Sequence, residues 1–377
     1  MQTTIMQVLP SLKQGGVEVG TIEIATALQE AGMPNIVVSS GGEMVAKLQK
    51  IGVPHITLPV QTKNPFKIWL NAKKLAKIAK ENNVGLMHVR SRAPAWSVWL
   101  ASRQTGIPFI SSYHGIYGIK PAIKKLYNRV MLKGLCTIAV SDYVKQHLMT
   151  VYHYPEDKIH VIHRGADLNR FNPDKITQEM LDEFVVQNQI PMDKPIVTLV
   201  GRLSKFKGQR ELIQAVKQMK KTEITCLLVG GKATEEYRQE LSHLMQTLPE
   251  ETTLKIISVG GDKMPVVYAL SDVVVSASLI PEAFGRTIAE ANAMHKIVVA
   301  FNHGGPTETI IDGKTGFLTP VGDVAALAQA LDKVLSMPIQ DKKVMEQAAK
   351  TNVEKSFSVQ KMCEKTITLY KELLNER

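Results

Sequence analysis

The sequence predicts an α/β protein made of two doubly wound domains, each with a parallel sheet that helices cover on both faces. Short apolar runs rich in β-branched residues alternate with longer segments of helical periodicity along the whole chain, as in repeated strand–helix crossovers. The chain has 377 residues, enough for two domains, and 44% of them are hydrophobic, so each domain can bury a core.

Each expected strand is a short apolar run that ends at a turn signal. These runs lie at 4–9, 35–39, 55–58, 86–89, 108–112, 137–140, 160–162, 196–200, 225–229, 254–259, 273–278 and 297–301. Helical periodicity predicts helices at 17–31, 63–80, 177–189, 235–248, 323–336, 342–353 and 358–374, the fifth with Asp323 as its N-cap. Parallel sheets bind ligands beyond the carboxyl ends of their strands, so the loops after the strands are the candidate sites.

One such loop follows the run that ends at Ser278 and carries a carboxylate, Glu282, with a second one, Glu290, eight positions later. Glu282 is expected in the loop and Glu290 about one turn inside the helix that begins after Gly285. Carboxylates accept hydrogen bonds from hydroxyl groups, so Glu282 suits a sugar and Glu290 suits a ribose diol. The alternative is an ordinary loop followed by an amphipathic helix with a solvated Glu.

The start of that helix is a candidate phosphate site. The amides of Phe284, Gly285 and Arg286 would point toward a ligand at the positive end of the helix, and the amide of Thr287 would add to them. Gly285 lets a ligand approach the backbone closely. The loop and the helix together therefore fit a nucleotide sugar, with its diphosphate held between the two carboxylates.

A second loop, Gly201 to Gly208, carries the cations Arg202 and Lys207 after an apolar strand. A guanidinium can engage two phosphate oxygens and an ammonium supplies a point charge, so both suit a diphosphate leaving group. A solvated basic loop is the alternative. The two cations together could neutralise the charge of that leaving group.

Three positions in the first half also follow expected strands. Gly15 and Gly16 form a glycine turn before a helix, a geometry that favours anions, although they are not part of a GxGxxG pattern. His114 follows the strand that ends near Ser112, where it is either a cleft residue or a structural histidine. Arg90 and Arg92 follow another strand and are candidates for an anionic acceptor, with salt bridges as the alternative.

The excess of positive over negative charge is confined to the first half of the chain. Residues 1–170 hold 21 Lys and Arg against 9 Asp and Glu, a net +12, and the remainder holds 46−21=25 against 35−9=26, a net −1. A nucleotide-sugar site in the second half does not require this excess, so we attribute it to an anionic partner of the first half.

The predicted helix at 63–80 is the most suggestive part of the basic half, because exposed apolar side chains among lysines are typical of a membrane surface. A solvated lysine face, with Phe66 packed under a loop, is the alternative. A second basic segment lies at 120–133. The candidate membrane residues are Phe66, Lys67, Leu70, Lys73, Lys74 and Lys77.

Composition excludes some classes of protein. No run of 18 apolar residues occurs, so a membrane span is not expected, and the first residues look like a strand and not like a signal peptide. Cys136, Cys226 and Cys363 lie far apart and form no metal-ligand spacing, which favours reduced thiols in the cytoplasm. No aromatic-rich nucleic-acid motif accompanies the basic charge.

Glu282, Phe284, Gly285 and Glu290 resemble the Glu-x7-Glu signature of retaining glycosyltransferases of family 4, which have the two-domain GT-B fold. The resemblance runs nearly end to end, with its elements in the family's order. Further matches are Gly15-Gly16, His114-Gly115, Gly201-Arg202 with Lys207-Gly208, Gly304-Gly305 with Glu308, and Asp312-Gly313-x-Thr315-Gly316.

For the fold, the resemblance implies two Rossmann-like doubly wound domains that face an interdomain cleft. The expected divisions are 1–172 for acceptor binding, 173–355 for donor binding, and 356–377 for a final helix that crosses back onto the first domain. Arg164-Gly165-Ala166 replaces the Asn-Gly-Val that many members have at the exit from the first domain. His295 stands where members often have Gly, so a positive φ is expected there.

For the site, the resemblance implies roles residue by residue. Gly15 and Gly16 would line the cleft, and His114 would lie beside the sugar. Gly230 and Lys232 would approach the donor, and the nucleobase would lie near Val259. Arg202, Lys207 and Glu282 would be catalytic with His114, and no dedicated base would be needed because the leaving phosphate takes the acceptor's proton.

Glycosyltransferases of the other major fold hold a metal with an Asp-x-Asp motif, which this chain lacks, so the resemblance implies that no metal and no cofactor take part. The expected function is metal-independent transfer of a sugar from a UDP- or GDP-sugar to an anionic or lipid-linked glycan, such as a lipopolysaccharide core or polysaccharide precursor. The enzyme would act in the bacterial cytoplasm, peripherally at the inner face of the membrane. Three alternatives stay open: a related enzyme with a soluble acceptor, a nucleotide-sugar epimerase, and a non-catalytic module that binds anionic lipids or nucleic acid.

Overall fold

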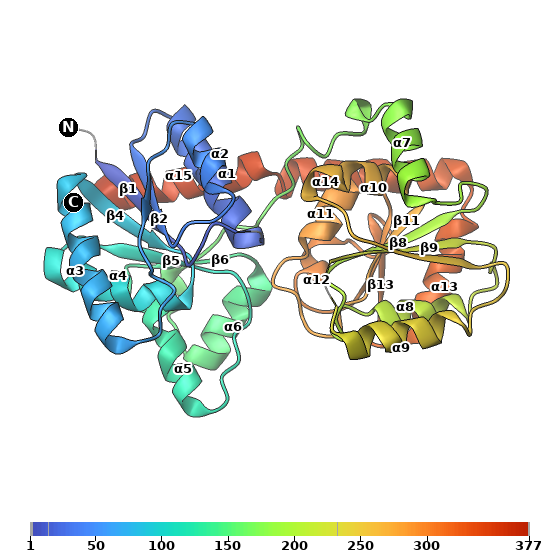
Figure 1. Cartoon of the computed structure of the whole chain (residues 1–377), viewed down its shortest axis with the longest axis horizontal. Helices are drawn as coiled ribbons and strands as arrows, with labels where there is room; N and C mark the ends of the chain where they lie inside the picture. The colour runs from blue at the N-terminus through green and yellow to red at the C-terminus, as the bar shows by residue number, and fades with distance from the viewer. Residues whose placement is uncertain (1–2, 14, 232, 376–377) are drawn as a thin grey trace. The chain divides into compact units, whose positions relative to one another are not determined.

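The computed structural model describes residues 3–13, 15–231 and 233–375, and it divides into two compact units (Figure 1). The first unit is Met1–Arg164 together with Gln360–Arg377, and the second is Gly165–Val359. Each unit holds one parallel sheet with helices on both faces, which confirms the predicted fold class.

The first unit is built on a seven-stranded parallel sheet with the order β3-β2-β1-β4-β5-β6-β7. Every residue of β1, β2 and β5 is buried, as expected for strands that helices cover on both faces. The strands are β1 (Thr4–Val8), β2 (Asn35–Ser39), β3 (His55–Thr57), β4 (Val84–Val89), β5 (Phe109–Tyr113), β6 (Thr137–Ala139) and β7 (Ile159–Val161).

The helices of the first unit connect these strands, with the last helix of the chain added. They are α1 (Gly16–Glu30), α2 (Val45–Lys50), α3 (Pro65–Glu81), α4 (Arg92–Thr105), α5 (Ala122–Asn128), the 3-10 turn η1 (Arg129–Leu132), α6 (Asp142–Tyr152), the 3-10 turn η2 (Glu156–Lys158) and α15 (Val359–Asn375). None of the helices among the described residues is both long enough and apolar enough to cross a membrane.

Helix α15 completes the first unit although it comes last in the sequence. The Tyr370 hydroxyl lies 2.5 Å from Nδ1 of His88 in β4, and Nε2 of the same ring lies 2.7 Å from Oγ of Ser112 in β5. Cys363 Sγ donates to the carbonyl oxygen of Glu23 in α1 at 3.6 Å. The expected return of the final helix to the first unit is therefore what the structure shows.

The second unit is built on a six-stranded parallel sheet with the order β10-β9-β8-β11-β12-β13. Its strands are β8 (Ile196–Val200), β9 (Thr225–Val229), β10 (Thr253–Ile257), β11 (Val273–Ser276), β12 (Val298–Phe301) and β13 (Gly316–Thr319). Its helices are η3 (Pro173–Lys175), α7 (Gln178–Asn188), α8 (Gln209–Val216), α9 (Glu235–Met245), η4 (Gly261–Lys263), α10 (Met264–Leu270), α11 (Arg286–Ala293), α12 (Pro306–Thr309), α13 (Val324–Leu335) and α14 (Ile339–Ser356), where η marks a 3-10 turn.

The start of the second unit differs from the expected division after residue 172. Ala166 pairs with Ser358, and Phe171 packs on Tyr268 with ring centroids 5.9 Å apart. Both contacts lie inside Gly165–Val359, so residues 165–172 belong to the second unit. An exit segment whose apolar side chains enter the second core cannot be distinguished from a linker by composition.

Two local predictions are confirmed and one strand was missed. Asp323 accepts a hydrogen bond from the amide of Ala326 at 2.9 Å and caps α13. His295 has φ of +57°, the left-handed conformation expected at a position that suits Gly. Strand β13 was not predicted, because its sequence, Gly-Phe-Leu-Thr, has only two large apolar residues and so forms no continuous apolar run.

Candidate active site

Two loops of the second unit meet at the carboxyl edge of its sheet. The loop after β8 and the loop after β11 come from neighbouring strands, and the amide of Leu279 donates to the carbonyl oxygen of Phe206 at 2.8 Å. Gly208 has φ of +77°, and a Cβ atom there would lie 1.9 Å from the carbonyl oxygen of Ala277. Only glycine fits, so the sequence Lys207-Gly208 fixes how closely the two loops approach.

This approach brings Lys207 and Glu282 together as an ion pair. Lys207 Nζ lies 2.6 Å from Glu282 Oε1, with 28% and 18% of the two side chains exposed. The hydroxyl of Ser278 donates to the same carboxylate oxygen. His303 Nε2 donates to the Ser278 carbonyl oxygen at 2.6 Å, so a third loop supports the carboxylate. Lys207 and Glu282, two of the three side chains predicted as catalytic in this unit, therefore share one partly accessible site.

A pair of glycines holds the backbone around Glu282. The amide of Gly305 donates to the Glu282 carbonyl oxygen at 2.8 Å, and Gly304 pairs with Glu282 in an isolated bridge. A Cβ atom at Gly305 would lie 2.3 Å from the Cα atom of Phe284. The Gly304-Gly305 match thus has a structural cause, since any side chain would push the two loops apart.

Helix α11 begins directly after this loop. Its N-cap is Gly285, with φ of +87°, and its first residue is Arg286. Thr287 is half-buried. The Phe284 side chain is buried against Phe357, with ring centroids 5.8 Å apart, so only its backbone can meet a ligand. The amides predicted to face a phosphate therefore stand at the start of a helix.

Glu290, inside α11, is held by two side chains. The Tyr268 hydroxyl donates to Oε2 at 3.1 Å, and Arg286 Nε lies 3.5 Å from Oε1. Burial, followed by the charge of Glu290, raises the pKa of Tyr268 well above its usual range, so the phenol stays a donor. Glu290 is thus an oriented carboxylate, as the assignment to a ribose requires.

The remaining predicted donor residues of this unit are less enclosed. The Arg202 side chain is exposed, and its carbonyl oxygen accepts a hydrogen bond from Gln209 Nε2 at 3.0 Å. A Cβ atom at Gly230 would lie 2.1 Å from the Gly201 carbonyl oxygen, so the ends of β8 and β9 touch there. Val259 is partly buried beyond the end of β10. Lys232 lies outside the described residues.

In the first unit, His114 follows β5 and its ring nitrogens are buried. Neither nitrogen has a hydrogen-bond partner among the residues that the structure describes. Burial, and then the positive charges of Arg164 and Arg90, hold the pKa of His114 well below its usual value. The ring is therefore neutral near pH 7, and it can exchange hydrogen bonds with a ligand hydroxyl.

The two arginines after β4 differ in their access to a ligand. Arg90 is 4% exposed and hydrogen-bonds Tyr370 of α15, so it is a packing residue and a poor candidate for an acceptor contact. Arg92 is partly exposed, stacks on Tyr117 at 4.0 Å and donates from Nη1 to Asn128 Oδ1 at 3.2 Å. Arg90 is therefore less accessible to an acceptor than Arg92, and both assignments stay predictions.

Gly15 and Gly16 stand at the start of α1, as predicted. Gly15 is the N-cap and is exposed, and its carbonyl oxygen accepts the amide of Val19 at 3.1 Å. The glycine turn therefore leads directly into a helix, which is the arrangement that suits an anionic ligand.

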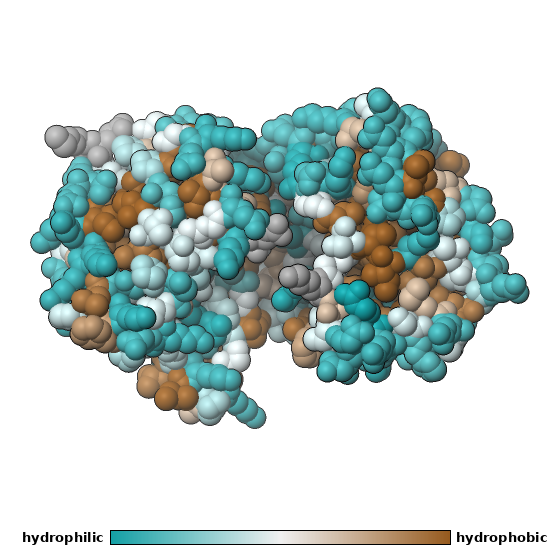
Figure 2. Space-filling model, in the orientation of Figure 1, coloured by the Kyte–Doolittle hydropathy of each residue, from teal (hydrophilic) through white to brown (hydrophobic). Residues whose placement is uncertain are grey.

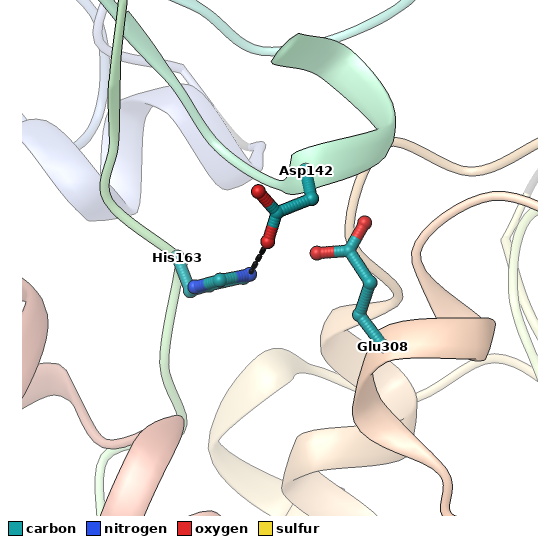
Figure 3. A group of neighbouring side chains, drawn as sticks. All are labelled: Asp142, His163 and Glu308. Carbon is teal, nitrogen blue, oxygen red and sulfur yellow. Dashed lines mark ion pairs between the residues drawn. The ribbon is translucent and has the colours of Figure 1, made fainter. Parts of the chain in front are cut away.

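Near the end of the first unit, Asp142 begins α6 and faces His163 (Figure 3). Its Oδ2 lies 3.7 Å from His163 Nε2. Glu308, labelled in the same view, belongs to α12 of the second unit. Sequence reasoning assigned no role to Asp142 or to His163.

Comparison with known proteins decides the family. Residues 14–170 match the family model described as Glycosyltransferase Family 4, and residues 182–351 match that of Glycosyl transferases group 1. The crystal structure of a glycosyltransferase from Rickettsia africae ESF-5 is 40% identical over 100% of both chains, with a TM-score of 0.92. This chain belongs to glycosyltransferase family 4.

Other relatives of this family 4 glycosyltransferase are more distant. The capsular polysaccharide biosynthesis glycosyltransferase CapM of Staphylococcus aureus is 28% identical over 246 residues, 63% of this chain and 62% of CapM. The structure of Anabaena Alr3699/HepE in complex with UDP-glucose has a TM-score of 0.84 at 23% identity and covers 98% of this chain and 100% of its own, which shows a shared fold.

The α3 surface of this glycosyltransferase is apolar and basic, as predicted. Phe66 is 66% exposed, so the alternative in which it packs under a loop is wrong. Trp69 and Leu70 are also exposed, and Lys73 Nζ lies 3.7 Å above the Trp69 ring. The opposite side of the helix is buried, as the periodicity required. The buried residues of α3 are Ile68, Asn71, Ala72, Leu75, Ala76 and Ala79.

Sequence reasoning missed several residues that lie beside the predicted ones. Tyr268 lies on α10, and only the fold brings it to Glu290. Ser278 was read as the end of a strand, although its hydroxyl binds Glu282. Trp69 was overlooked beside Phe66, although an apolar residue three positions further along a helix lies on nearly the same side.

Proposed function

We propose that this chain is a retaining glycosyltransferase that transfers a sugar from a nucleotide-sugar donor to an anionic or lipid-linked glycan. The Lys207–Glu282 ion pair at 2.6 Å carries this assignment. A cation suited to a diphosphate and a carboxylate suited to a sugar hydroxyl meet there, at the edge where parallel sheets bind ligands. Glu290 stands in the helix that begins four residues after Glu282, as a ribose contact requires.

The two cations of the loop after β8 neutralise the leaving diphosphate in this proposal. Lys207 exchanges its contact with Glu282 for a phosphate oxygen when the donor binds, and the exposed Arg202 side chain turns toward the same group. The amides at the start of α11 add to this stabilisation. The reaction then needs no divalent metal, and turnover in the presence of a chelator tests this.

Glu282 orients the sugar and does not act as a base. Its Oε1 already accepts from the Ser278 hydroxyl and from the Lys207 ammonium group, and these two contacts hold the carboxylate in place to accept from a sugar hydroxyl. The bond from the anomeric carbon to the diphosphate breaks, and a bond to the acceptor oxygen forms on the same side of the sugar. The acceptor's proton passes to a phosphate oxygen of the leaving group. We assign the neutral His114 ring to a sugar hydroxyl.

Names of relatives support the donor class. The HepE structure holds UDP-glucose, and a relative from Mycolicibacterium smegmatis, 25% identical over 280 residues, is named a GDP-mannose-dependent mannosyltransferase. The donor nucleotide is therefore proposed to be UDP or GDP, without a choice between the two. Since CapM acts in capsular polysaccharide biosynthesis by its name, a lipopolysaccharide core or polysaccharide precursor fits the net charge of +12 in residues 1–170.

The membrane contact is part of the proposal. Exposed Phe66, Trp69 and Leu70 among the lysines of α3 suit the interface of an anionic bilayer, where apolar side chains insert and ammonium groups meet lipid phosphates. The enzyme would then work peripherally at the inner face of the cytoplasmic membrane, where a lipid-linked acceptor is presented.

A thermal-shift panel of UDP-, GDP- and ADP-sugars tests the donor, because a ligand that binds only the folded state raises the melting temperature. The same donors, supplied with membranes and a chelator, should release nucleoside diphosphate, and NMR of the product should show retained anomeric configuration. If no nucleotide sugar shifts the melting temperature or is consumed, the proposed function is wrong. Flotation with anionic vesicles distinguishes a lipid-linked acceptor from a soluble one, because an enzyme with a soluble acceptor should stay unbound.

A further inference from the structure

Helix α5 exposes two large aliphatic side chains and buries a polar one. Ile123 is 72% exposed and Leu126 is 63% exposed, and the buried residue of α5 is the polar Asn128. Figure 2 shows a hydrophobic patch at the lower end of the first unit, where Figure 1 places α5. Two large aliphatic side chains facing water are unfavourable in a free protein, and they indicate a surface that another apolar phase covers.

Polar contacts hold α5 in this orientation. Asn128 Nδ2 donates to the Gly118 carbonyl oxygen at 3.2 Å and to the Tyr152 hydroxyl at 3.1 Å. Asn128 Oδ1 accepts from Arg92 Nη1 at 3.2 Å, and the Tyr127 ring packs on Trp96 at 5.8 Å. The apolar side of α5 is therefore presented outward by specific bonds on its inner side.

A cationic hollow lies directly beside this apolar side. Its volume is about 500 Å³, and Lys63, Arg92 and Lys124 line it together with Ile123 and Tyr127. No carboxylate is among its described lining residues. In the sequence, Glu81 is the only acidic residue between Glu43 and Asp142, so the surrounding segments also lack a counter-charge. A hollow with three cations and an apolar rim suits a phosphate group attached to a hydrocarbon chain.

We propose that the α5 surface, defined as Ile123, Leu126 and the hollow of Lys63, Arg92 and Lys124, docks on an anionic lipid bilayer. A lipid phosphate occupies the hollow, and the two aliphatic side chains enter the acyl region. This inference rests on the membrane contact of the proposed function and extends it from α3 to α5, because Lys63 precedes α3 and joins the two elements at the hollow.

Charge decides among the possible occupants. A second copy of this chain would place cations against cations, which costs free energy. An acidic protein could neutralise the hollow, but the lipid supplies both the phosphate and the apolar phase that Ile123 and Leu126 require. The bilayer is therefore the occupant to which the proposal commits.

A label at position 126 tests the docking directly. Native Cys136, Cys226 and Cys363 are buried, so an environment-sensitive dye will attach to the introduced thiol of Leu126→Cys. Vesicles of phosphatidylcholine with phosphatidylglycerol should brighten and blue-shift the dye, and vesicles of phosphatidylcholine alone should not. The matched control is Ile339→Cys, 73% exposed at the start of α14, whose label should not respond.

Binding variants supply the second measurement. Lys63→Gln with Lys124→Gln should weaken flotation about fivefold for each charge removed. Ile123→Ser with Leu126→Ser should weaken it tenfold or more, since two aliphatic side chains no longer insert. The control pair is Ile339→Ser with Val344→Ser, which removes similar exposed aliphatic groups from the second unit and should float as the parent does.

Three outcomes would overturn the proposal: a silent 126 label on protein that floats, an equal response to phosphatidylcholine alone, or the same response to inorganic phosphate without vesicles. Flotation and labelling need no donor. Absence of flotation with intact donor binding and sugar transfer therefore refutes the docking together with the membrane contact and leaves the sugar transfer standing, whereas intact docking without sugar transfer from any donor refutes the sugar transfer alone.

Discussion

The loops of the second unit and the surface of the first unit use positive charge in opposite ways. Lys207 and Arg286 lie within 4 Å of Glu282 and Glu290, and all four side chains are less than one-third exposed. The cations around α3 and α5 are mostly exposed, and Glu81, which pairs with Lys77 at 3.6 Å, is the only acidic residue in the long segment that contains both helices. Paired, sheltered charges orient a small ligand, whereas excess surface charge attracts a large anionic partner.

The largest effect is expected where the paired charges are broken. Glu282→Ala or Lys207→Ala should lower kcat by about two to four orders of magnitude, the scale of lost electrostatic stabilisation. The matched control is Glu240→Ala, which breaks surface pairs with Lys205 and Arg210 in the same unit and should keep its turnover. Steady-state kinetics and circular dichroism together check this, and a fully active, folded Glu282→Ala protein would contradict the assignment.

Removing exposed lysines from α3 should weaken the binding of the enzyme to membranes and leave the rate of sugar transfer unchanged. The triple variant Lys67→Gln, Lys74→Gln and Lys77→Gln should reduce partitioning onto anionic vesicles about a hundredfold, at about 1 kcal/mol for each lysine. Lys217→Gln with Lys220→Gln and Lys221→Gln changes the net charge equally in the second unit. Equal losses for the two triple variants would show that only net charge matters and that α3 has no special role.

A smaller effect is expected from the hydroxyl that orients Glu290. Tyr268→Phe removes one hydrogen bond to a carboxylate, so the KM for the donor should rise about tenfold with little change in kcat. Tyr237→Phe is the control, because its hydroxyl donates to Gln209 at 3.1 Å, away from both carboxylates. A fall in kcat at constant KM would instead show that the Tyr268 hydroxyl stabilises the transition state and does not contribute to donor binding.

The smallest effect concerns backbone strain. His295→Gly should raise the free energy of unfolding by about 1 kcal/mol, because φ of +57° costs a residue with a Cβ atom and suits glycine. His160→Gly in the extended strand β7 should instead lower it. Urea titration of both variants measures the difference, and a loss of stability for His295→Gly would show that contacts of its ring outweigh the strain.

Periodicity predicted most of the sheets because buried parallel strands are continuous apolar runs. It also predicted the Lys207 and Glu282 loops, since residues at the ends of neighbouring strands meet. Contacts that depend on distant segments were not predicted: Tyr268 reaches Glu290 from another helix, and Arg90 is covered by Tyr370 from the far end of the chain. Ile123 and Leu126 are spaced as on a core-facing helix, yet Asn128 turns them outward.

The return of α15 to the first unit has a consequence for biosynthesis. A ribosome makes all of Gly165–Val359 before it reaches Tyr370, so the early half of the chain waits without its last helix while the later half is translated. During that interval His88 and Arg90 lack their phenol partner. Nascent chains stalled before residue 359 should therefore be more sensitive to protease in the first unit than released chains are.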